Sequence, residues 1–550
     1  MNLIFFAYVC LVSASVFANN QLLVLSGGNS PSGNHYSQYL QTNTIYSDLK
    51  ERLDYPVSVL FAAGNNETSK TAFADVHKTE KESSPSGLLN YDKYIYGVIT
   101  GNRPATKTNV ISYFNKDVKP KLNNFFLIVT DHGMPFYNSE GQPDLTYSNN
   151  CIDLWNIKLE NNQIQDIGNF EQARCLSQKE LNVLLRQKVQ AKNRVFAMSQ
   201  CFSGGFHQMA VNMTQGHPSI NTGICGFTAI TEDTIASGCS PDVDGPSYQG
   251  YERSFTEQLT GIDYVNKKRL RPGKKSFKDA HEAAVLEDLT VDIPLSTSDY
   301  YLWKWSSLLG SHIAFEMGAN YLSKVSSAEF DSKLQLTKKM EAAVKVKFPE
   351  LTSAVNASIK KLEQHVKQLE NKMAEQEAAG ETLFAQFEKL YYELAYSVWI
   401  DQLISGKSMN LTIEELQTEK FIVQLENSTG SSGPRVLTRQ ILPIMWSQDP
   451  ARARSTSIYI SERQNKILDY IASQGDQELK NQVQAMKTLE QNGNLAYENL
   501  DVLSKQHGLL RRLLIYRQVL GSWVVLNLNV NVTALSDLQS TLECEQTPLF

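Results

Sequence analysis

The chain has 550 residues, a formal net charge of -6, 42% hydrophobic residues and 20% charged residues. These values are ordinary for a globular protein with a sizeable core, and the length predicts two to four domains of roughly 100–200 residues each. The mild acidity argues against nucleic acid as the main partner, because phosphate binding usually needs a basic surface.

Residues 1–18 have the pattern of an export signal. An apolar run, Leu3 to Val16, leads into Ser15-Val16-Phe17-Ala18, whose small residues at the last and third-last positions suit signal peptidase. We expect cleavage after Ala18 and an exported mature protein, secreted or periplasmic or lumenal. The alternative is an uncleaved membrane anchor, although the run is short for a span of ~20 residues. The other apolar stretch, Leu509 to Val530, carries three arginines that would be costly in a bilayer.

The first half of the chain alternates apolar strands with helical stretches. The expected strands are Leu22–Leu25, Val57–Phe61, Phe125–Val129, Val195–Met198 and Gly226–Ile230. Residues 39–53 and 178–191 have helical spacing. Continuous apolar strands separated by helices indicate an α/β domain, here residues 19–325, with a mainly parallel sheet and helices on both faces. We expect the site beyond the carboxyl ends of the strands.

After residue 325 the pattern becomes helical. An apolar stripe is spaced 4, 3, 4, 3 and 4 residues apart, as in a heptad repeat, over Val355, Ile359, Leu362, Val366, Leu369 and Met373. A loop follows near 427–434, and a second helical block runs from about 462 to 519. We therefore predict a mostly α-helical domain over 326–550 with a heptad segment at 355–373. The stripe fits either helices packing against each other or an oligomerising coiled coil.

Six cysteines remain after removal of the signal. They are Cys151, Cys175, Cys201, Cys225, Cys239 and Cys544. Export permits disulfides, and Cys151 with Cys175 and Cys225 with Cys239 are plausible local pairs, although sequence alone does not fix connectivity. The spacing does not suggest a zinc site, so we expect no metal and no cofactor.

Two strands run straight into residues suited to nucleophilic catalysis. The third leads into Thr130-Asp131-His132-Gly133 and the fourth into Ser199-Gln200-Cys201-Phe202-Ser203-Gly204-Gly205. Adjacent parallel strands would put His132 and Cys201 side by side, where an imidazole raises thiol reactivity and later protonates the leaving amine. Gly133 and Cys201 could supply two main-chain N–H donors for an oxyanion, and the two later glycines allow a sharp turn.

Two rival assignments are weaker. Ser203 could be a hydrolase serine, but that motif requires G-x-S-x-G and Cys201 occupies the position two before it. His207 could partner Cys201, but a residue so close in sequence is expected to lie on the following helix and point elsewhere. We therefore expect the dyad of Cys201 and His132.

The His and Cys segments resemble a known family. Val129-Thr130-Asp131-His132-Gly133 and Gln200-Cys201-Phe202-Ser203-Gly204 are similar to the corresponding blocks of the legumain-type cysteine peptidases. These share the caspase-like fold, and the catalytic subunit of the glycosylphosphatidylinositol transamidase belongs to the same group. The segment Tyr91–Val98 is similar to a Tyr-x-Gly-Val segment of legumain. The resemblance covers roughly residues 20–310 and implies a caspase-like fold acting on peptide or protein substrates.

The resemblance also implies residue roles. Cys201 would be the nucleophile, His132 the general acid/base, and Gly133 an oxyanion donor. Asn34, in Gly33-Asn34-His35-Tyr36, matches the family's Asn that orients the His, with a turn residue as the alternative. Asp131 matches an Asp before the His, where a structural role is the alternative.

The substrate pocket departs from the family pattern. Tyr36 stands where the family has an Arg, Phe202 where an acidic residue is frequent, and Glu252 is offset from the family's Asp. We expect Tyr36, Ser237 and Glu252 to line a pocket that does not select Asn. A long insertion between His132 and Cys201 could be stapled over the cleft by Cys151 and Cys175.

These features predict a secreted cysteine endopeptidase acting through a thioester. The alternatives are a transpeptidase or transamidase, or a catalytically silent binding or scaffold protein on a caspase-like fold, which the altered pocket favours. The helical domain could cover the cleft as a pro-domain does in legumain, or could bind partners.

Overall fold

A computed structural model describes most of the chain. The described residues are 19–65, 74–84, 87–138, 140–160, 163–166, 173–214, 216–244, 248–310, 323, 325, 327–391, 477–529 and 531–550. The expected signal at 1–18, the loop at 427–434 and the first part of the second helical block lie outside them. Within these ranges, no helix combines the length and the apolar character needed to cross a bilayer.

A six-stranded sheet forms the centre of the α/β region. Its order is β17-β14-β11-β5-β1-β2. The strands are β1 (Gln21–Ser26), β2 (Val57–Phe61), β5 (Leu122–Val129), β11 (Ala191–Met198), β14 (Ile224–Thr228) and β17 (Leu295–Ser296). All neighbours pair in parallel except β17, which runs antiparallel to β14. The five expected strands all lie in this sheet, which confirms a mainly parallel α/β architecture.

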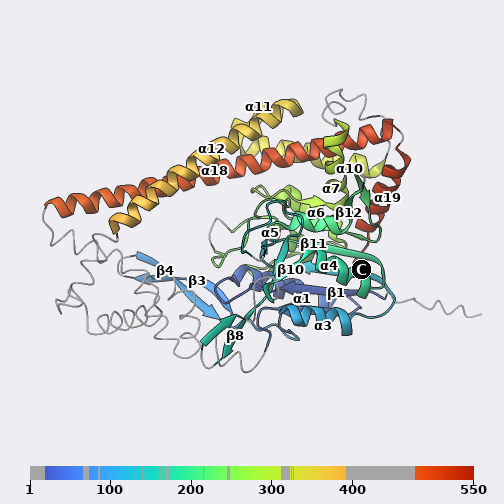
Figure 1. Cartoon of the computed structure of the whole chain (residues 1–550), viewed down its shortest axis with the longest axis horizontal. Helices are drawn as coiled ribbons and strands as arrows, with labels where there is room; N and C mark the ends of the chain where they lie inside the picture. The colour runs from blue at the N-terminus through green and yellow to red at the C-terminus, as the bar shows by residue number, and fades with distance from the viewer. Residues whose placement is uncertain are drawn as a thin grey trace, which may run out of the picture.

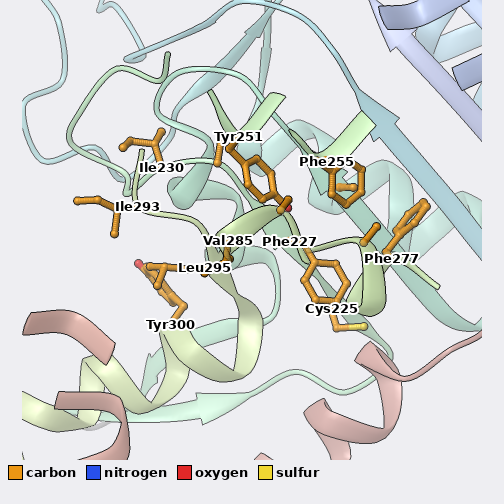
Figure 2. Packing of buried hydrophobic residues seen from close by; sticks show 14 of the residues in the cluster. Cys225, Phe227, Ile230, Tyr251, Phe255, Phe277, Val285, Ile293, Leu295 and Tyr300 are labelled. Carbon is orange, nitrogen blue, oxygen red and sulfur yellow. The ribbon is translucent and has the colours of Figure 1, made fainter. Parts of the chain in front are cut away.

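Helices cover both faces of the sheet, as predicted. They are α1 (Tyr36–Arg52), α3 (Lys107–Lys116), α4 (Gln178–Lys188), α5 (Tyr251–Thr260), α6 (Phe277–Glu287) and α7 (Thr297–Leu309). Leu22 and Val24 of β1 belong to a core with α1, α5, α6 and α7, whereas Leu23 and Leu25 belong to a second core with α3 and α4. Because each strand is buried on both sides, its sequence is a continuous apolar run. Figure 2 shows part of the first core around Phe227 of β14.

Smaller strands and hairpins surround the central sheet. A three-stranded sheet has the order β10-β7-β6, with β6 at Gly133–Met134, β7 at Cys151–Asp153 and β10 at Cys175–Ser177. A disulfide joins Cys151 to Cys175, so that predicted pair is confirmed. The other elements are the hairpins β3–β4 (Val76–Ser84, Gly87–Ile95), β8–β9 (Ile157–Glu160, Gln163–Asp166), β12–β13 (Val211–Thr214, His217–Ile220) and β15–β16 (Ile262–Asp263, Lys268–Arg269), and the 3-10 helix η2 (Ser203–Met209).

The region after residue 325 is helical where it is described. Its elements are α10 (Ala328–Lys347), η3 (Pro349–Leu351), α11 (Thr352–Val355), α12 (Ile359–Tyr391), α18 (Gln477–Leu528) and α19 (Val532–Glu545). The long helices α12 and α18 lie side by side above the α/β region (Figure 1). The stripe residues Val355 to Leu369 are buried, and Met373 is half-buried. The stripe therefore serves packing of helices within the chain.

The helical region shares a core with the α/β region. One buried cluster contains Leu22 of β1 together with Leu513 of α18 and Leu538 of α19. A second disulfide joins Cys225 to Cys544, so the predicted pairing of Cys225 with Cys239 is wrong. The reason is that Cys225 sits inside β14, which packs on α19, whereas Cys239 lies in the loop beyond the carboxyl end of that strand.

Candidate active site

The pairing of β5 with β11 brings the His and Cys segments together. Val129 and Met198 are register partners, and His132 and Cys201 each lie three residues further along. The N–H of Ser199 still donates to the carbonyl oxygen of Val129 over 3.1 Å. At Gly133, an added Cβ atom would overlap the carbonyl oxygen of Cys201. The main chains of the two segments are therefore in contact, and residue 133 has room only for glycine.

The imidazole of His132 is held by the loop that follows β1. Its Nε2 atom lies 2.6 Å from the carbonyl oxygen of Gly33. Because a carbonyl only accepts, Nε2 carries the proton and Nδ1 keeps the lone pair. Burial lowers the pKa of His132, so the ring is neutral at physiological pH. Nδ1 is therefore the ring nitrogen that is able to accept a proton.

Asp131 acts on the main chain. Its buried carboxylate accepts hydrogen bonds from the N–H groups of Gly27, Gly28 and His132. Burial, together with repulsion from Asp153, raises the pKa of Asp131 well above its usual range. These bonds tie the turn after β5 to the loop after β1, which is the structural role that the sequence left open.

Asn34 contacts a different group from the one the resemblance implies. Its Nδ2 atom donates to the carbonyl oxygen of Asp75 over 2.8 Å, and its buried Oδ1 atom has no hydrogen-bond partner among the described residues. The hydrogen bond to the His132 ring comes from Gly33, one residue earlier. The ring of His35 packs edge-on against His132 with centroids 4.9 Å apart. Sequence reasoning missed Gly33 and His35, although both follow the strand that neighbours β5.

The Cys201 thiol faces the loop after β14. The N–H of Ala236 donates to Cys201 Sγ over 3.3 Å, and Sγ lies 3.8 Å from the Ala236 carbonyl oxygen. Burial raises the pKa of the thiol to about 11, the hydrogen bond from Ala236 opposes this, and the carboxylates of Asp292 and Glu252 add to it. The half-buried resting side chain is therefore a neutral thiol at physiological pH.

The turn after Cys201 is made by Phe202. Its φ is 56°, in the left-handed region that non-glycine residues rarely occupy. Its N–H donates to the carbonyl oxygen of Thr234 over 2.9 Å. Gly204 and Gly205 serve close packing, because added Cβ atoms would collide with the main chain of Thr231 and Glu232 and with Asn150. Gly204 therefore lets the segment after β14 pack directly against the turn that follows Cys201, and Gly205 lets the insertion do so.

Both rival residues are buried and hydrogen-bonded within the α/β region. Ser203 is fully buried, and its Oγ atom accepts from the N–H groups of Ala229 and Ile230. His207 is buried in η2, with its ring nitrogens 3.0 Å from the hydroxyls of Thr297 and Thr228. Both side chains are part of the core.

The buried carboxyl group of Glu252 contacts the thiol of Cys239 and is one of the groups that raise the pKa of Cys201. It lies in the first turn of α5, and burial, then Asp292, raises its pKa to about 8. Its Oε2 atom lies 3.8 Å from Cys239 Sγ, and its buried Oε1 atom has no hydrogen-bond partner among the described residues. Cys239 is a free thiol that sequence reasoning assigned to a disulfide. Glu252 and Cys239 thus form one polar cluster.

The other two expected pocket residues are placed differently. The N–H of Ser237 donates to Asp292 Oδ1 over 2.6 Å, directly after Ala236. Tyr36 stacks on Tyr39 with centroids 6.0 Å apart, and its ring lies 4.9 Å from Lys78 Nζ. Ser237 therefore belongs to the loop that contacts Cys201, whereas Tyr36 packs against α1, β3 and a buried cluster that includes Val243 and Tyr248.

The insertion supports the turn behind Cys201. Asn150, next to the Cys151–Cys175 disulfide, donates from Nδ2 to the carbonyl oxygens of Phe202 and Glu232, each over 2.9 Å. Residues 161–162 and 167–172 of the insertion lie outside the described residues. The disulfide joins β7 to β10 within the insertion, and the hydrogen bonds of Asn150 connect the insertion to the turn after Cys201.

A scan against protein-family models and a search of curated proteins find no match to this chain. Within the described residues, His, Cys, Asp and Glu side chains do not form a group of three or more that could hold a metal ion.

Proposed function

We propose that this protein is an exported cysteine endopeptidase of the legumain-like type, with Cys201 as nucleophile and His132 as general base and acid. The observation that carries the proposal is the contact between the two strand-end segments, where Gly133 meets the Cys201 carbonyl. A thiol and a neutral imidazole at adjacent strand ends form the minimal machinery of acyl transfer to sulfur. The caspase-like fold remains part of this proposal.

The resting state fits general-base activation. Cys201 is a thiol and His132 Nδ1 is unprotonated, so the thiol proton passes to Nδ1 as Sγ attacks the substrate carbonyl carbon. The tetrahedral oxyanion collapses to a thioester as the C–N bond breaks, and the imidazolium protonates the leaving amine. Water then adds to the thioester with His132 as base, releasing the acid and restoring the thiol.

The orientation of the Gly133 N–H supports its proposed role as an oxyanion donor. Gly133 is the register partner of Ile152, and the hydrogen bond between β6 and β7 runs from the Asp153 N–H to the His132 carbonyl over 3.0 Å. Gly133 therefore occupies a non-hydrogen-bonded pair, whose own N–H points away from the partner strand. β6 is the edge strand of its sheet, so no neighbouring strand lies on the side to which this N–H points.

Two thiols are free among the described cysteines, so labelling can separate them. A peptide with an electrophilic carbonyl should modify Cys201 in the wild type and in Cys239→Ala, but not in Cys201→Ala or His132→Ala. Cleavage of a peptide library should follow the same order. Equal labelling of Cys201→Ala would eliminate the proposed nucleophile.

A silent binding protein is the second candidate, since burial raises the pKa of Cys201 to about 11 and lowers that of His132, which disfavours a preformed ion pair. Labelling by iodoacetamide without any labelling by peptide electrophiles would support it. Transamidase activity is distinguished by adding hydroxylamine, because a thioester then yields a peptide hydroxamate. The two disulfides are compatible with export.

A further inference from the structure

A buried arginine of the helical region ends beside the active-site loops. Arg512 of α18 is fully buried, and its guanidinium binds the turn that follows α6. It donates to the carbonyl oxygens of Asp292 over 2.7 Å and Asp288 over 2.6 Å, and to Asp288 Oδ2 over 2.9 Å. Further contacts reach the carbonyls of Val285 and Thr290. Most of the N–H donors of the planar guanidinium therefore hold main-chain carbonyl groups of this turn in place.

The residue held by Arg512 organises the site. One oxygen of the Asp292 carboxylate accepts from the N–H of Ser237 over 2.6 Å, and the other accepts from the N–H of Tyr251 over 2.7 Å. Ser237 follows Ala236, whose N–H contacts Cys201 Sγ. Tyr251 precedes Glu252 and begins α5. A single carboxylate therefore joins the loop at the nucleophile to the helix that carries the buried acid.

We propose that Arg512 is a positioning residue of the active site, acting through Asp292 on the Ala236–Ser237 loop and on the first turn of α5. The effect of Arg512 on peptide cleavage rests on the proposed function. It assigns to the helical region a constitutive role in the active state, in place of the removable cover that a pro-domain would provide.

The attachment of the helical region agrees with this role. The Cys225–Cys544 disulfide joins α19 to the central sheet, and the buried Glu545 accepts from the N–H and hydroxyl of Ser298 at the start of α7. The Tyr55 hydroxyl donates to the carbonyl oxygen of Leu549 over 2.9 Å. These contacts anchor the C-terminal segment to the face of the sheet that α1, α5, α6 and α7 cover, so removal of residues 477–550 would expose core.

The same helix supplies a matched control. Arg517 is also buried, but it binds Glu341 and the carbonyl oxygens of Ala357 and Val355, all within the helical region. Replacing either arginine by lysine keeps the charge and removes most of the forked hydrogen bonds. Of these two lysine variants, only Arg512→Lys should shift the position of the Asp292 carboxylate. Asp292→Asn tests the same link from the other side, because an amide cannot accept from both N–H groups.

The experiment measures the rate at which iodoacetamide alkylates Cys201 in the full-length folded protein from pH 6 to 10. After the reaction the protein is digested, and alkylation is quantified on the peptide that contains Cys201. The groups close to this sulfur are Ala236, Asp292, Glu252 and Cys239. In Arg512→Lys and Asp292→Asn, the alkylation rate at pH 8 should change at least threefold, and kcat for peptide cleavage should fall more than tenfold with little change in KM. In Arg517→Lys the alkylation profile should match the wild type even if the unfolding temperature falls.

Wild-type alkylation profiles in both Arg512→Lys and Asp292→Asn would overturn the positioning role. If Arg512→Lys does not fold, Asp292→Asn decides alone. Absence of peptide cleavage by the wild type would reject the proposed function, yet the alkylation comparison would still report whether Arg512 and Asp292 place the loop at Cys201.

Discussion

The main-chain N–H of Ala236 donates a hydrogen bond to the Sγ atom of Cys201 over 3.3 Å. The loop after β14 therefore contacts the proposed nucleophile directly, in addition to the strand pair that brings the His132 and Cys201 segments together. Because this loop is bound by Asp292 and packed against Gly204, the environment of the thiol depends on residues distant in sequence. The reactivity of Cys201 reports on that environment.

The pH dependence of Cys201 alkylation should differ from that of an ordinary thiol. Burial raises the pKa of Cys201 to about 11, so the thiolate fraction is lower than normal at neutral pH and grows until about that pH. The rate with iodoacetamide should therefore keep rising above pH 10 in the folded protein. In urea the same peptide should reach its plateau near pH 9 to 10. A plateau below pH 8 in the folded protein would instead indicate a thiolate–imidazolium pair.

The features predicted correctly from the sequence are those set by local pattern and strand pairing. Apolar runs such as Phe125–Val129 marked the strands because both faces of the sheet are covered. The approach of the His and Cys segments followed from a single assumption, that the two strands are neighbours. The spacing of the stripe from Val355 to Leu369 predicted a buried helix face, because residues three and four positions apart lie on the same side of a helix.

The missed features depend on tertiary contacts that leave no local pattern. Cys225 and Cys544 are 319 positions apart, so no spacing rule connects them. The partner of the His132 ring is the carbonyl oxygen of Gly33, a group that every residue possesses. Arg512 indicated only that its segment does not span a membrane, because its acceptors are main-chain groups of a distant turn.

Gly133→Ala should disable the proposed site. The added methyl group would overlap the Cys201 carbonyl oxygen and force the two strand-end segments apart, displacing the expected oxyanion donor. Loss of one such donor costs about 100- to 1000-fold in rate, so we expect at least a 100-fold fall in kcat. Gly216→Ala is the control for a strained glycine-to-alanine change away from the site: its φ of 81° disfavours alanine, but no atom among the described residues lies within 4 Å of its added Cβ atom. Equal activity of Gly133→Ala and wild type would exclude this role.

Glu252→Gln should reduce the pH dependence of stability. Burial raises the pKa of Glu252 to about 8, so between pH 4.5 and 8 the native state binds a proton that the unfolded state has lost. Stability from this group is therefore full below pH 4.5 and is lost as the pH rises through 8. The fall in unfolding temperature between pH 5 and 8.5 should be smaller in the variant by at least about 2 °C. Replacing the exposed Glu51 by Gln should leave the fall unchanged.

The two disulfides should contribute unequally to stability. The Cys225–Cys544 bond closes a loop of 319 positions and the Cys151–Cys175 bond one of 24, which in the chain-entropy picture stabilise by roughly 5–6 and about 3 kcal/mol respectively. Thermal unfolding of the paired Cys225→Ala/Cys544→Ala variant should thus occur at a lower temperature than that of Cys151→Ala/Cys175→Ala.

The Cys225→Ala/Cys544→Ala variant should also expose the chain around α19 to protease, because that helix would be held to β14 only by packing. The second variant should mainly slow the reaction of Cys201 with peptide electrophiles, since Asn150 supports the turn at Phe202. The opposite ranking would mean that α19 is anchored chiefly by the contacts of Glu545 and Leu549.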